Sequence, residues 1–316
     1  MIFKIDNNLF IQYTPVDIAE LLSAMIKNNH YIACANNRIY EKITENIKNH
    51  ASSRVNELMT VYRRFSIDEY HRDLLTEIDT NNFTYQQLMI LAEKPAVLLP
   101  ENTREWKVYT HIIKAYTADV KVREVALTLL EAVNNRTFIT KQIGGNGEMK
   151  TQIESLAQQE YDGATISWKC CVIIDRDVEA DYDATGKWKL KTTMDNLFRY
   201  LSTKDSTSLS HNDIYSVSQP TFHWHMWYKR MIENYFPDNA YLHIGCDLTN
   251  FNTLKEVRDY REISGKTIRG YKKDDIGRLT EVMGWRDYNR GLVQFPHNGV
   301  MYTELELLLF KMCKII

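Results

Sequence analysis

The chain has 316 residues, 39 basic and 41 acidic side chains, and a hydrophobic share of 44%. This near-neutral balance argues against a protein that simply coats nucleic acid, because such proteins carry a strongly basic domain. No window reaches the apolar length of a membrane span, residues 1–10 do not resemble a secretory signal, and the five cysteines lack paired zinc-ligand spacing. We therefore expect free thiols, a cytoplasmic location and no membrane partner.

Residues 1–94 are predicted to form a mostly helical N-terminal region that is structural or binds a partner. Thr14-Pro15 should open a helix, because apolar residues recur after it at helical spacing. Phe3–Ile5 and Leu9–Ile11 are expected to pair as a short hairpin. We find no group of residues typical of a catalytic site in this region.

From Pro95 onward, apolar runs alternate with helical patterns. This alternation predicts a domain over residues 95–316 with an α/β fold, in which a mainly parallel sheet is flanked by helices. The three expected strands of this alternation are Ala96–Leu99, Thr137–Ile143 and Trp168–Ile174, and a further strand, Thr221–Trp227, is expected later in the chain. The expected helices between and after them span residues 106–116, 120–132, 148–159, 193–202 and 303–316.

Distinctive residues follow each of the three strands. Glu101 comes after the first, with Glu105 one helical turn later; Gly144-Gly145 end the second, and Asp175 and Asp177 end the third. Carboxyl ends of parallel strands lie at one edge of a sheet, so these residues should meet there. Neighbouring carboxylates repel one another, and a cation between them relieves the repulsion. The simpler alternatives are an acidic loop for the aspartates and helix capping for the glutamates.

Two downstream features suggest further contributions to such a site. Glu233 lies in an apolar stretch, where a carboxylate needs a cation, a hydrogen bond or a proton. An ion pair with Lys229 or Arg230 is the simpler explanation. Lys266 and Lys272 belong to a basic cluster that is a candidate phosphate-binding patch, and a solvated charged face is its alternative.

In this order, the motifs resemble those of TOPRIM nucleases of the OLD (overcoming lysogenization defect) type. The resemblance spans about residues 95–237 and includes departures: Asn102 follows the strand-end Glu where the family commonly has Gly, and Pro100 precedes it. No ATPase motif is present, so the chain resembles a stand-alone TOPRIM subunit. The motifs that carry the resemblance are Leu98–Glu105, Gly144-Gly145, Ile173–Asp177 and Met231–Tyr235.

The resemblance implies a metal-dependent endonuclease that hydrolyses DNA or RNA. Mg²⁺ or Mn²⁺ would be held by Glu101, Asp175 and Asp177, because such ions prefer oxygen ligands. A second ion would be held with help from Glu105 and Glu233. Lys266 or Lys272 would offset the charge that builds on the phosphate.

The resemblance also implies partners. It suggests a separate ATPase subunit of ABC/SMC type and a role in anti-phage defence, and it leaves open whether the chain forms a homo-oligomer. One alternative is a non-catalytic TOPRIM-like subunit that binds or regulates a partner. Another is a phosphoryl transfer like that of primases or topoisomerases, although spacing marks no tyrosine as a topoisomerase nucleophile.

Overall fold

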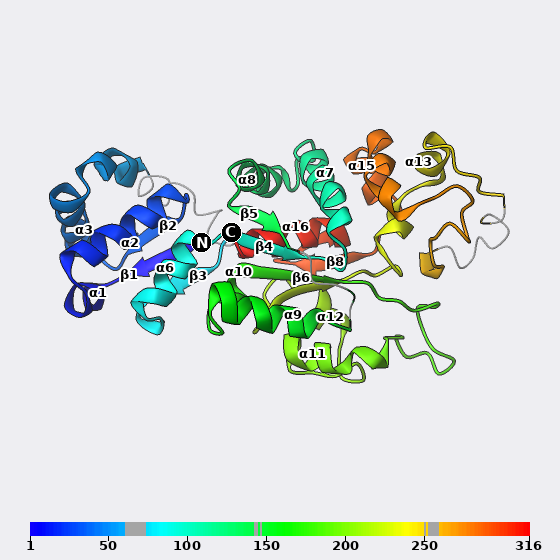
Figure 1. Ribbon diagram of the computed structural model, residues 1–316, viewed down its shortest axis with the longest axis horizontal. Helices are drawn as coiled ribbons and strands as arrows, with labels where there is room; N and C mark the ends of the chain where they lie inside the picture. The colour runs from blue at the N-terminus through cyan, green and yellow to red at the C-terminus, as the bar shows by residue number, and fades with distance from the viewer. Residues whose placement is uncertain (61–73, 142–144, 146, 250, 252–258) are drawn as a thin grey trace. The chain divides into compact units, whose positions relative to one another are not determined.

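The protein is α/β, with parallel sheets flanked by helices (Figure 1). The computed structural model describes residues 1–60, 74–141, 145, 147–249, 251 and 259–316. The chain divides into two compact units. The first comprises Met1–Ala96, Ser155–Lys169 and Cys313–Ile316, and the second comprises Val97–Glu154 and Cys170–Met312. Residues 155–169 and 313–316, which the sequence placed in the second domain, thus group with the first unit.

The first unit contains a three-stranded parallel sheet in the order β2-β1-β3. Its strands are β1 (Ile2–Ile5), β2 (Tyr31–Cys34) and β3 (Glu77–Asp79). Its helices are α1 (Asn7–Gln12), α2 (Pro15–Lys27), α3 (Asn37–His50), α6 (Tyr85–Glu93) and α10 (Ile166–Lys169). Helices carry most of the residues here, but the parallel sheet was not predicted.

The hairpin predicted near the N-terminus is wrong. Leu9–Ile11 lies inside α1, because the Asp6 side chain accepts a hydrogen bond of 2.8 Å from the Asn8 amide and so caps a helix. Leu9 is buried in the core of this unit. The predicted start of α2 is confirmed, since Thr14 and Asp17 form a reciprocal capping box.

The second unit is built on a four-stranded sheet in the order β5-β4-β6-β7. Its strands are β4 (Ala96–Leu99), β5 (Phe138–Thr140), β6 (Cys170–Ile174) and β7 (His223–Met226). Strand β6 pairs in parallel with both β4 and β7. Every residue of these three strands is buried, as expected for a sheet covered on both faces.

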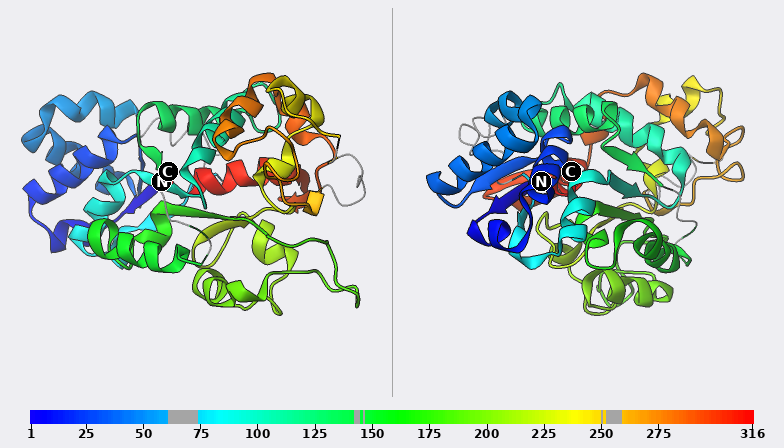
Figure 2. Two further views of the ribbon diagram at one scale, coloured as in Figure 1. Left: turned by 45° about the vertical axis from the view of Figure 1, so that its right-hand side comes forward. Right: turned by 60° about the vertical axis from the view of Figure 1, so that its left-hand side comes forward.

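Helices cover both faces of this sheet. Helices α7 and α8 lie on one side, and α11 and α12 lie on the other (Figures 1 and 2). Their bounds are α7 (Trp106–Tyr116), α8 (Arg123–Asn134), α11 (Asp195–Ser202) and α12 (His211–Tyr215). Further elements are α9 (Met149–Leu156), α13 (Asp238–His243), α14 (Ile276–Leu279), α15 (Trp285–Asn289), the hairpin β8 (Gln294–His297) and β9 (Val300–Thr303), and α16 (Glu304–Lys314).

Three short 3₁₀ turns matter for the site: η3 (Thr103–Glu105), η6 (Ile232–Tyr235) and η8 (Lys273–Asp275). Most predicted elements of this unit are confirmed with small shifts in their ends. Trp168 and Lys169, for example, belong to α10 rather than to β6. The hairpin β8–β9 was not predicted. Among the described residues, no helix has both the length and the apolar character needed to cross a membrane.

Candidate metal centre

The pairing of β4 with β6 brings two acidic segments to one edge of the sheet. Leu99 lies opposite Val172 in the parallel register, so the residues that follow both strands emerge side by side. A cavity of about 380 Å³ lies at this edge, and it has four acidic and two basic side chains in its wall. Its charged lining residues are Glu101, Glu105, Asp175, Glu233, Arg104 and Lys273.

Glu101 is the acid with an unused buried oxygen. Its Oε2 is enclosed and has no hydrogen-bond partner among the described residues. Burial raises the pKa of Glu101, and the charge of Asp177 raises it further, while a hydrogen bond shared with Asp175 acts in the opposite direction. Glu101 and Asp175 are therefore close enough for each to act on the pKa of the other.

Gly145 lies against Glu101. A Cβ built on Gly145 would sit 3.7 Å from Glu101 Oε1, which is an ordinary contact distance. The backbone at Gly145 thus borders the carboxylate, at the edge where the sequence predicted it. Gly144, the other half of that motif, lies outside the described residues.

Glu105 and Glu233 are both almost fully buried, at 7% and 5% exposed. Burial, followed by the nearby charge of Glu233, raises the pKa of Glu105 to about 8. The Glu105 side chain does not cap α7; the Tyr109 hydroxyl instead donates to its Oε2 at 2.8 Å. Burial likewise raises the pKa of Glu233, and the Tyr271 hydroxyl donates to its Oε1 at 3.4 Å.

The simple explanation for Glu233, an ion pair with a neighbouring base, does not hold. Lys229 pairs instead with Asp259 at 2.8 Å, and Arg230 lies 3.9 Å from Glu179. Glu233 therefore faces the cavity without either of the cations that its local sequence offered.

Asp175 and Arg176 point to opposite sides of the chain. Asp175 lines the cavity, and burial, with the charges of Glu105 and Glu101, raises its pKa well above the ordinary value. Arg176 is fully buried elsewhere, where its guanidinium donates to Asp181 Oδ1 at 2.9 Å and to the Tyr228 carbonyl at 2.7 Å. Two consecutive residues thus have different roles: Asp175 lines the cavity, and Arg176 makes buried hydrogen bonds.

Asp177 is placed differently from the expectation. The sequence suggested that it points the same way as Asp175, but its φ of 54° turns the backbone into the left-handed region. It does not line the cavity, although its charge raises the pKa of Glu101. Its Oδ2 instead pairs with Lys191 Nζ at 2.7 Å.

The structure brings different lysines to the site from those proposed. Lys273 lines the cavity, and both Lys273 and Lys191 act to lower the pKa of Glu101. Lys266 and Lys272 are exposed and do not line it. The sequence also missed Tyr109, which could have been found from its spacing of four residues from Glu105 on one helical face. Lys273 belongs to the same basic cluster of the sequence as Lys266 and Lys272. No local signal marks Lys191.

These acids share one cavity without converging on one point. Within the described part of the chain, no three side chains of His, Cys, Asp or Glu are grouped closely enough to hold a metal ion as they stand. The raised pKa values of Glu101, Glu105, Asp175 and Glu233 nevertheless have a common cause, which is burial reinforced by mutual repulsion. The cavity is therefore a place where an added cation would lower the electrostatic energy.

Comparisons of the chain with protein-family models, with curated proteins and with solved structures give no match. The resemblance to TOPRIM nucleases stays a prediction that rests on the motifs.

Proposed function

We propose that the chain is a metal-dependent phosphodiester hydrolase with a TOPRIM-like fold, cutting DNA or RNA. The observation that carries the proposal is the group of four carboxylates in one cavity at the edge of a parallel sheet. Buried carboxylates are unfavourable unless a cation, a proton or hydrogen bonds compensate them. A divalent ion among these acids would offset their mutual repulsion.

The donor set fits Mg²⁺ or Mn²⁺, because it consists of carboxylate oxygens. Glu101 is the best-supported ligand, since its Oε2 is buried without a partner among the described residues. Asp175 and Glu233 would complete a first site, with Glu105 beside them and Asp177 available once Lys191 moves away. Ions bound there would activate a water molecule and stabilise the leaving oxygen of a phosphodiester.

The remaining residues have roles that follow from their own contacts. Tyr109 holds Glu105 in place through its hydroxyl. Lys273 lines the cavity and would neutralise a phosphate oxygen, a role for which a compact ammonium group is suited. Gly145 leaves the backbone beside Glu101 without a side chain, so a phosphate could approach closely.

The test compares the wild type with Glu101→Gln, which keeps the shape of the side chain and removes its charge. We expect Mn²⁺ to raise the melting temperature of the wild type but not of the variant, because a ligand stabilises the state that binds it. The wild type should cleave plasmid DNA or bulk tRNA in the presence of Mg²⁺ or Mn²⁺, and Glu101→Gln should not. Glu179→Gln is the matched control, since Glu179 is 84% exposed. A wild type that neither gains stability nor cuts either substrate would sink the proposal.

A second candidate is a non-catalytic subunit that binds or regulates a partner. It is favoured by the Lys191–Asp177 ion pair, in which the protein supplies its own cation to one of the acids. Folded wild-type protein that shows no Mn²⁺-dependent stabilisation would favour this function. From the resemblance alone, we also propose a separate ATPase of ABC/SMC type as the partner.

A further inference from the structure

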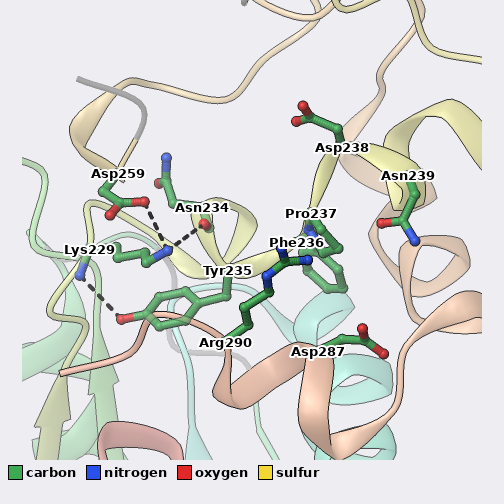
Figure 3. Close-up of a pocket in the computed structure, with 10 residues that line it drawn as sticks. All are labelled: Lys229, Asn234, Tyr235, Phe236, Pro237, Asp238, Asn239, Asp259, Asp287 and Arg290. Atoms are coloured by element: carbon green, nitrogen blue, oxygen red, sulfur yellow. Dashed lines mark hydrogen bonds and ion pairs between the residues drawn. The ribbon is translucent and has the colours of Figure 1, made fainter. Parts of the chain in front are cut away.

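A second cavity is lined by residues that directly follow Glu233 in the chain (Figure 3). It has a volume of about 560 Å³, which falls in the range of small-molecule pockets. The turn η6 separates the two cavities. Glu233 lines the first, whereas the next residues, Asn234, Tyr235 and Phe236, line the second.

The cationic groups of this cavity are not equivalent. Lys229 is already engaged, since its Nζ lies 2.8 Å from Asp259 Oδ1 and donates to the Asn234 carbonyl at 3.3 Å. The Arg290 guanidinium has no ion pair or side-chain hydrogen bond to any described residue. Figure 3 shows it extending toward Phe236 in the middle of the cavity. Arg290 is therefore the donor that is available to a ligand.

Carboxylates share the cavity with this guanidinium. Asp238, Asp259 and Asp287 all line the cavity, so its acidic side chains outnumber its basic ones. Asp287 also caps α15 by accepting from the Gly284 amide at 2.8 Å. A free phosphate would meet net repulsion here. A neutral ligand that offers acceptors to Arg290 and donors to a carboxylate would not.

Guanine has that combination of groups. Its O6 and N7 form an acceptor pair that matches the fork of an arginine, and its N1–H and N2 amino group form a donor pair that matches a carboxylate. Adenine and cytosine lack the adjacent imino and amino donors. The partly exposed Pro237 adds apolar surface for a planar base.

We propose that this cavity binds a guanine base. The base would belong to a free guanosine nucleotide or to an unpaired guanine of a nucleic acid strand. The second source rests on the proposed function, because it would place that guanine next to the phosphodiester bond at the metal centre.

The direct test is calorimetric titration of the full chain with GMP, AMP and CMP, without metal. These nucleotides differ only in their base. GMP should bind at least about fivefold more tightly than the other two, as one bidentate contact provides. Arg290→Met should remove this preference. Arg286→Met, which changes an exposed arginine of α15 outside the cavity, should keep it.

Asp238→Asn provides a second variant that keeps the side-chain shape, and it too should weaken GMP selectively. Equal affinity of the wild type for all three nucleotides would overturn the proposal. So would a guanine preference that persists unchanged in both Arg290→Met and Asp238→Asn.

The two sources are separated with a short single-stranded oligonucleotide that contains one guanine, and with its adenine counterpart. If the cavity binds a guanine of a strand, the guanine-containing oligonucleotide should bind at least about fivefold more tightly than its adenine counterpart. GMP should then compete with it. Equal binding of both oligonucleotides, alongside selective GMP binding, would identify the free nucleotide.

Failure of the guanine site and failure of the proposed nuclease function give different results. Selective GMP binding that survives in Glu101→Gln supports the guanine site even if the wild type never cleaves a nucleic acid. Cleavage without any guanine preference removes the guanine site and leaves the nuclease proposal intact.

Discussion

The Tyr235 hydroxyl donates a hydrogen bond to Glu304 Oε2 and so ties η6 to the first residue of α16. The other oxygen of this buried carboxylate accepts from the Tyr228 amide at 2.7 Å and lies 3.0 Å from His225 Nε2. Glu304 thus holds both ends of the segment between β7 and η6. Because Glu233 lies in η6, this contact helps to place it at the cavity.

Tyr235→Phe should lower the free energy of unfolding by about 1–3 kcal/mol, since it removes a buried hydrogen bond to a charged group. Urea denaturation measures the change. Tyr182→Phe is the control, because Tyr182 is half-exposed, and its effect should stay within about 0.5 kcal/mol. Equal stabilities of wild type and Tyr235→Phe would show that the contact does not hold η6.

The metal-free protein should lose stability as the pH rises from about 4.5 to about 8. The folded pKa of Glu105, about 8, lies above its ordinary value of 4.5. A carboxyl whose pKa is raised by folding contributes stability below the unfolded value, and this contribution is lost as the pH rises through the folded value. Thermal unfolding in EDTA at several pH values measures the effect.

Glu105→Gln should flatten this pH dependence across the same window, because the amide cannot ionise. Glu124→Gln, on the exposed face of α8, should leave the slope unchanged. An identical slope in the wild type and Glu105→Gln would exclude Glu105 as its source.

If the chain is a nuclease, Lys273→Met should reduce the cleavage rate by about 10²–10³-fold at saturating metal, because the phosphate loses a neutralising charge. Lys266→Met and Lys272→Met are matched controls, since both lysines are exposed outside the cavity. We expect their rates to stay close to that of the wild type. A greater loss in Lys272→Met than in Lys273→Met would reverse this assignment.

Lys191→Met should tighten Mn²⁺ binding about twofold to fivefold, because the metal no longer competes with a partly exposed ion pair for Asp177. The shift in the Mn²⁺ concentration at half-maximal thermal stabilisation measures it. Lys187→Met, an exposed lysine of the same loop, should not change that concentration. Weaker Mn²⁺ binding by Lys191→Met would mean that Lys191 assists the site.

The strands that form the site edge could be predicted because β4 and β6 are unbroken apolar runs, as fully buried strands require. Their parallel order then implied that Glu101 and Asp175 would meet. Which of Lys272 and Lys273 lines the cavity could not be predicted from the strand pattern. The two are adjacent and alike, and only the turn η8 determines which one reaches the cavity.

Other features depend on contacts that no local pattern reveals. Tyr235 and Glu304 are 69 residues apart, and nothing in either neighbourhood points to the other. In the first unit, Leu9–Ile11 reads as a strand by composition. The Asp6 cap and the burial of Leu9 outweigh that preference.

The opposite directions of Asp175 and Arg176 constrain how this segment can evolve. A change of length by one residue before Asp175 would turn the guanidinium toward the acids and the carboxylate toward the buried position where Asp181 and the Tyr228 carbonyl now receive Arg176. The buried hydrogen bonds of Arg176 and the acidic lining of the cavity would be lost together. We expect this stretch to vary by substitution while its length stays fixed.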